Sequence, residues 1–104
     1  MSLQVVRDAL LKVTNQVSHY KAFKKTDQYI VWAEDSQGDA LYGDNRMSEQ
    51  AIEGTIDYFT RTEYDPNFEK IQEVLSEAEI SYRLNSVQYE DETGYIHYEW
   101  VFQV

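Results

Sequence analysis

Tyr29-Ile30-Val31-Trp32-Ala33 is aromatic and β-branched at both alternating positions, which predicts a strand covered on both faces. A polar, acidic segment of about residues 34–50 follows it and is expected to be a long loop. Residues 51–60 then alternate apolar and polar side chains, as a half-buried strand does. Asp65-Pro66 marks the start of a helix, because aspartate favours the N-cap and proline the first helical position.

The N-terminal segment is predicted to be an amphipathic helix, followed by a polar, basic connection over residues 19–27. One apolar stripe runs along this helix at spacings of three and four residues: Leu3, Val6, Leu10, Val13 and Val17. The helix after Asp65-Pro66 has a similar stripe: Phe68, Ile71, Leu75 and Ala78. Each helix therefore has one face that must be buried.

The C-terminal segment, residues 80–104, is predicted to be a long β-hairpin. Apolar residues alternate at period two on both sides of the acidic turn Glu90-Asp91-Glu92-Thr93-Gly94, whose glycine is expected to have a positive φ. The apolar phase changes between Leu84 and Val87, which predicts a bulge near Asn85-Ser86.

These elements form a single domain of 104 residues with the order αββαββ. The order favours the α+β class, with an antiparallel four-stranded sheet and both helices packed on one face. Gly54, inside a predicted strand, indicates a bulge or a close approach of another backbone. The second face of the sheet would carry four apolar or aromatic residues: Tyr29, Val31, Tyr95 and Val101. We expect that face to be too polar for a second core but aromatic enough for an interface.

The net charge of −10 is unevenly distributed along the chain. Residues 1–25 carry five cationic residues and one acid, a net charge of +4, whereas residues 26–104 carry four cationic residues and eighteen acids, a net charge of −14. Most of the chain would therefore repel phosphate and anionic lipid. A nucleic-acid contact would depend on Lys21, Lys24 and Lys25, which are more simply explained as the solvated end of a helix.

The composition also limits the compartment and the kinds of site. There is no cysteine, so neither a disulfide nor a thiolate metal site can form. No apolar run approaches the roughly 20 residues of a transmembrane helix, and no signal peptide is expected. We therefore expect a protein made in a cytoplasm, with no membrane contact.

Candidate catalytic and metal-binding residues are few. His19 and His97 are the two histidines, and no serine, cysteine or lysine is spaced to act with either. Asp35, Asp39 and Asp44 could form a loose cation site, but the spacing of a calcium-binding loop is absent. No nucleotide-binding or hydrolase motif is present. We expect no enzyme activity, no catalytic residue, no metal and no cofactor.

Two segments are the best candidates for protein contacts. They supply Lys21, Lys24 and Lys25 from the basic connection, and Asp35, Asp39, Leu41, Tyr42 and Asp44 from the acidic loop. Nine tyrosines are many for this length, and tyrosine is common at interfaces. A small sheet can equally use them at the edge of its core.

The element order and several segments resemble the small tail-terminator and tail-completion proteins of long-tailed bacteriophages and prophages. The similar segments are Tyr29–Glu34 with the acidic loop, Gly54–Thr60, Tyr64–Pro66 and the closing strand Gly94–Trp100. The resemblance covers most of the chain, from about Leu3 to Val104, and rests on pattern and order, not on a diagnostic motif.

That resemblance implies an α+β structural protein of the virion tail, produced in the bacterial host cytoplasm. It implies a ring-type homo-oligomer, such as a hexamer, at the head-proximal end of the tail tube. The partners would be further copies of the chain, the tail tube and the head-tail connector. DNA would pass through the ring without specific binding, and an acidic lumen would suit that passage.

Two other functions compete with this interpretation. One is a monomeric acidic regulator or DNA mimic that binds a basic partner. The other is a small enzyme that uses His97 and a carboxylate, which would need a pocket around that histidine.

Overall fold

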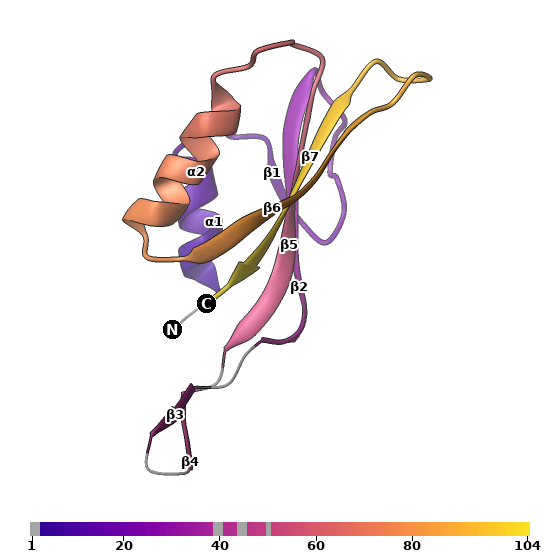
Figure 1. The fold of residues 1–104 in the computed structure, drawn as a ribbon. Helices are drawn as coiled ribbons and strands as arrows, with labels where there is room; N and C mark the ends of the chain where they lie inside the picture. The colour runs from indigo at the N-terminus through magenta and orange to yellow at the C-terminus, as the bar shows by residue number, and fades with distance from the viewer. Residues whose placement is uncertain (1–2, 39–40, 44–45, 50) are drawn as a thin grey trace.

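The computed structural model describes residues 3–38, 41–43, 46–49 and 51–104 (Figure 1). Its elements, in chain order, are α1 (Gln4–Leu11), β1 (Val17–His19), β2 (Gln28–Gln37), β3 (Leu41–Gly43), β4 (Arg46–Glu49), β5 (Ile52–Thr60), α2 (Asn67–Glu77), β6 (Ser81–Tyr89) and β7 (Ile96–Gln103). The α+β class is therefore confirmed.

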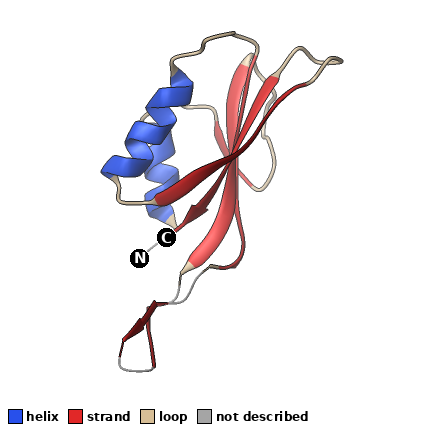
Figure 2. Ribbon diagram, in the orientation of Figure 1, coloured by secondary structure: helices blue, strands red, loops and turns tan. Residues whose placement is uncertain are grey.

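The main sheet has five strands in the order β1-β2-β5-β7-β6, and both helices lie against one of its faces (Figure 2). β1 is parallel to β2, and the other neighbours are antiparallel. The prediction of a four-stranded, purely antiparallel sheet in the order αββαββ was wrong, because β1 was assigned to the helix and the connection after it. Three residues are too few to show the alternation that identifies a strand.

The first helix is shorter than predicted, since α1 ends at Leu11 and Val17 lies in β1. Thr14 interrupts the helix: its hydroxyl oxygen accepts a hydrogen bond from the Gln16 backbone N–H at 3.2 Å, a local bond that favours a turn. Val13 and Val17 still pack against the core, although from different elements. The apolar spacing was therefore a sign of burial and not of one continuous helix.

The predicted loop over residues 34–50 was also wrong in part. β2 continues through the acidic residues to Gln37, and β3 pairs with β4 in a separate two-stranded antiparallel sheet. The pairing of β2 with β5 supplies the backbone hydrogen bonds that hold this polar stretch extended, whatever its side chains prefer.

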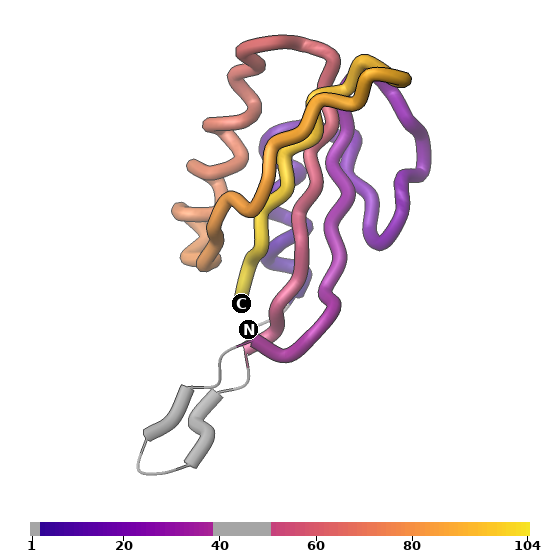
Figure 3. Tube along the Cα trace, turned by 45° about the vertical axis from the view of Figure 1, so that its right-hand side comes forward, coloured from indigo at the N-terminus to yellow at the C-terminus, as the bar shows by residue number. Residues whose placement is uncertain are grey.

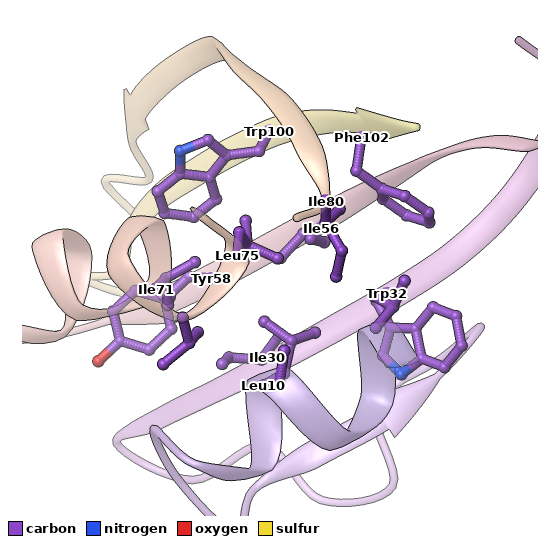
Figure 4. Close-up of a cluster of buried hydrophobic side chains, with 13 residues drawn as sticks. Leu10, Ile30, Trp32, Ile56, Tyr58, Ile71, Leu75, Ile80, Trp100 and Phe102 are labelled. Carbon is purple, nitrogen blue, oxygen red and sulfur yellow. The ribbon is translucent and has the colours of Figure 1, made fainter. Parts of the chain in front are cut away.

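The core lies between the helices and the sheet (Figure 4). Ile30, Ile56 and Trp100 come from three adjacent strands, β2, β5 and β7, and all three are buried. Leu10 of α1 and Leu75 of α2 close over them and are also buried. Burial of these apolar side chains is the main stabilising term for a domain of this size.

A half-buried carboxylate fixes the start of α2. One oxygen of Asp65 accepts hydrogen bonds from the hydroxyls of Tyr58 and Thr60, at 2.6 and 2.7 Å, and the other accepts one from the Asn67 backbone N–H at 2.8 Å. Burial raises the pKa of Tyr58 far above its ordinary value, and the bond to Asp65 raises it further. Asp65 therefore lies at the helix start, as expected, and also links that end of α2 to β5 through two hydrogen bonds.

The predicted hairpin is present as β6 and β7. Gly94 in its turn has a φ of 79°, the left-handed conformation that glycine adopts without a steric penalty. The register shifts between Leu84 and Ser86, which confirms the predicted bulge.

Gly54 is buried at the place where β2 and β7 approach β5 most closely. A Cβ at this position would lie 2.1 Å from the carbonyl oxygen of Ala33 and 2.8 Å from the ring of Phe102. The neighbouring strand β2 has a register shift between Glu34 and Ser36, opposite this glycine. The close backbone approach predicted for Gly54 is confirmed.

Gly54→Ala is expected to lower the free energy of unfolding by about 3 kcal/mol, because the new methyl group must displace backbone. Gly38→Ala is the matched control, because the three atoms nearest to its Cβ all belong to the side chain of Gln103, which can move. The control should cost less than about 1 kcal/mol. Urea unfolding of both variants measures the difference, and equal losses would contradict the steric account.

Candidate interaction surfaces

The loop between β1 and β2, residues 20–27 and called here the basic loop, is fixed at both ends. The Tyr20 backbone N–H donates to the carbonyl oxygen of Trp32 at 2.9 Å, and the Phe23 backbone N–H donates to the Ser18 hydroxyl oxygen at 3.1 Å. At the other end, the Tyr95 hydroxyl donates to the carbonyl oxygen of Thr26 at 2.6 Å. The loop is therefore held in one place on the sheet.

Three lysines and a phenylalanine of the basic loop are exposed and available for contacts. Lys21, Lys24 and Lys25 are exposed, as a contact surface requires, and they lie after β1, not at a helix end as expected. Phe23 lies among them and is 97% exposed. Phe23 was not among the predicted contact residues, although a single large apolar residue among lysines was the available signal.

The basic loop covers part of the sheet face that lies away from the helices (Figure 3). Beneath it, Tyr29 stacks on Phe59 with ring centroids 4.7 Å apart, and the edge of Tyr95 meets Tyr29 at 5.5 Å. Tyr29 and Tyr95 are buried, and the Arg61 guanidinium lies 4.1 Å from the Tyr95 ring centroid. The two tyrosines are therefore buried by their own chain, whereas the two valines predicted on the same face are half-buried. A role of this face in an interface stays a prediction.

His97 lies beside this cluster and is held by carboxylates. Its Nε2 lies 2.7 Å from Asp57 Oδ1, its Nδ1 lies 3.8 Å from Glu90 Oε2, and its ring stacks on Phe59 at 4.2 Å. The hydrogen bond to Asp57 raises the pKa of His97; burial opposes this shift, and the charges of Glu90 and Glu99 add to it. Both ring nitrogens face acids, so this geometry suits a fixed imidazolium and leaves no nitrogen directed at a substrate.

His19 is similarly engaged. It lies in β1, not at a helix end, and stacks on Trp32 with ring centroids 4.0 Å apart. Its Nε2 lies 2.7 Å from Glu34 Oε1, and the Tyr20 hydroxyl donates to the other oxygen of Glu34 at 2.7 Å. Among the described residues, no group of three or more histidine and acidic side chains could hold a metal ion.

Only some of the acidic-loop residues predicted to make contacts lie among the described residues. Asp35 is exposed near the end of β2 and accepts a hydrogen bond from the Ser36 hydroxyl at 3.0 Å. Leu41 and Tyr42 belong to β3, and Asp39 and Asp44 lie outside the described residues. A joint role of these residues stays a prediction.

A second surface lies on the helix-bearing side of the sheet. A groove of about 460 Å³, called here the helix-side groove, is lined by Glu63, Tyr64, Asp65, Pro66, Phe68, Glu69, Ile96 and Tyr98. Beside it, Val87 and Tyr89 of β6 are 51% and 64% exposed and pair with Tyr98 and Ile96 across the hairpin. Tyr64 on the rim is 90% exposed. Such apolar exposure in one place is typical of protein contact surfaces.

Comparison with known proteins assigns no family. No protein-family model matches the chain, and no curated protein matches it. Within the described ranges, no helix is both long and apolar enough to cross a membrane.

Asp57→Asn is expected to lower the free energy of unfolding by about 1 kcal/mol near pH 6, because it removes the charged partner of His97. Since the folded-state pKa of His97 is raised, its contribution is complete below the unfolded pKa and is lost as pH rises through the folded pKa. The variant should therefore approach the wild type above about pH 8.

Denaturant unfolding between about pH 5 and pH 9 measures this effect. Asp27→Asn is the control, because Asp27 pairs with Arg61 at 3.0 Å and not with a histidine. A loss at Asp57 that does not change with pH would contradict the assignment of His97.

Proposed function

We propose that this chain is a structural protein of a bacteriophage or prophage tail, which forms a ring at the head-proximal end of the tail tube. The observation that carries the proposal is exposed apolar surface in two separate places. Phe23 projects from the basic loop, Tyr64 lines the helix-side groove, and Val87 and Tyr89 are exposed beside it. In a chain of 104 residues, such exposure is explained by assembly with other protein surfaces.

The sequence pattern supports the same role. The resemblance to tail-terminator and tail-completion proteins implies a ring of several copies, such as a hexamer, in contact with the tail tube and the head-tail connector. The ring would end tube polymerisation in the virion tail after synthesis in the host cytoplasm.

The charge distribution is compatible with DNA passing through such a ring. The net charge of −10 disfavours a tight grip on phosphate, and the exposed lysines of the basic loop are a small part of the surface. In this proposal DNA therefore passes through the ring and is not bound specifically.

A second function is supported by the outer face of α2. Glu69, Glu73 and Glu77 are exposed and lie one turn apart, in a single row of negative charge. A monomeric acidic regulator or DNA mimic would use such a row against a basic partner. This second function does not account for the exposed Phe23.

Native mass spectrometry and negative-stain electron microscopy of the purified chain test the two functions. The tail proposal predicts closed oligomers of the 12.3-kDa chain, alone or on added purified tail tubes. A chain that stays monomeric in both conditions would contradict it. A monomer that binds basic protein with strongly salt-dependent affinity would favour the acidic regulator.

A further inference from the structure

Phe23 is presented to solvent by a fixed backbone. Its own N–H is bonded to Ser18, and the loop is tied to the sheet through Tyr20 and Thr26, yet the ring remains 97% exposed. Because the backbone is already fixed, the loop loses little backbone entropy when a partner covers this side chain. Such residues are the usual centres of binding energy in protein interfaces.

The helix-side groove has the shape and chemistry to receive an aromatic ring beside cations. Phe68 and Tyr98 form part of its lining, with ring centroids 4.8 Å apart. Glu63 and Glu69 lie on its rim and are exposed. Phe23 is itself flanked by exposed lysines, so the two surfaces are complementary in both polarity and charge.

Phe23 cannot enter the helix-side groove of its own chain, because the two surfaces lie on opposite faces of the sheet. The basic loop covers the face that carries Tyr29 and Tyr95, whereas the groove lies beside Phe68 on the face that carries the helices. A contact between them must therefore join two chains, and it is head-to-tail because each chain uses a different surface. Contacts of this kind give closed rings when the rotation between copies is suitable.

We infer that Phe23 of one copy inserts into the helix-side groove of the next copy, with Lys21, Lys24 and Lys25 beside the carboxylates of Glu63 and Glu69. This inference deepens the proposed ring and rests on it. The partner is a second copy of this chain, because the chain itself supplies both complementary surfaces.

Cysteine cross-linking tests the contact directly, since the chain has no cysteine of its own. Lys24→Cys protein, which keeps Phe23, is mixed with Glu69→Cys protein under mild oxidation, and with Glu77→Cys protein as the control. Glu77 is also exposed on α2 but lies outside the groove. Residues held in contact should form the mixed disulfide at least about tenfold faster than the control pair.

Substitutions of the native residues give an independent measurement. Phe23→Ser should raise the dissociation constant of the oligomer about 30-fold, whereas Phe23→Leu should largely preserve it. Lys24→Glu with Lys25→Glu should weaken assembly, and Glu63→Lys with Glu69→Lys in the mixed partner should restore it. Sedimentation velocity gives the constants, and circular dichroism confirms that each variant is folded.

The possible results distinguish failure of this contact from failure of the proposed ring. If the wild type forms rings but the 24–69 and 24–77 pairs cross-link equally and Phe23→Ser assembles normally, the contact is wrong and the ring stands. If the wild type shows no oligomer at any concentration, alone or on tail tubes, and no preferential cross-link, both are wrong.

Discussion

The structure depends on one apolar layer, formed where the two helices cover a single face of the five-stranded sheet. Trp32, Ile56 and Trp100 form a row across three strands, and the helices are placed where they can close over it. β5 is central to this arrangement, since it pairs with β2 and β7 and comes close enough to both that only glycine fits at position 54. Most of one face is committed to the core, so the surfaces available for contacts are the other face, the two sheet edges and the groove where α2 begins.

Local chemistry in the sequence was enough to predict some elements and not others. The start of α2, the glycine turn, the bulge near Asn85-Ser86 and the close approach at Gly54 each depend on a few neighbouring residues, and each is confirmed. β1 could not be predicted, because three residues show no period and their parallel partner lies further along the chain. For the candidate sites, the exposed lysines were identified, but the exposure of Phe23 and the burial of Tyr29 and Tyr95 depend on how the loop folds back.

The two faces of the sheet are stabilised by different interactions. On the helix-bearing face, apolar burial is extensive and leaves a groove where α2 begins. On the other face, a short loop covers three aromatic rings, while hydrogen bonds and ion pairs hold His97, Asp57 and Arg61. A rigid loop over a small aromatic cluster holds an outward side chain more steadily than a free loop would, and this is what an assembly contact requires.

The bulge in β6 lowers the tendency of the protein to aggregate through the edge of its sheet. β6 is the last strand in the sheet order, it has nine residues, and several of its side chains are exposed and apolar. A long, flat edge of this kind would be a template for adding strands from other molecules without limit, as in a fibril. The bulge between Leu84 and Ser86 twists that edge and interrupts its register. A protein that exposes apolar surface for a limited assembly is in this way protected from an unlimited one.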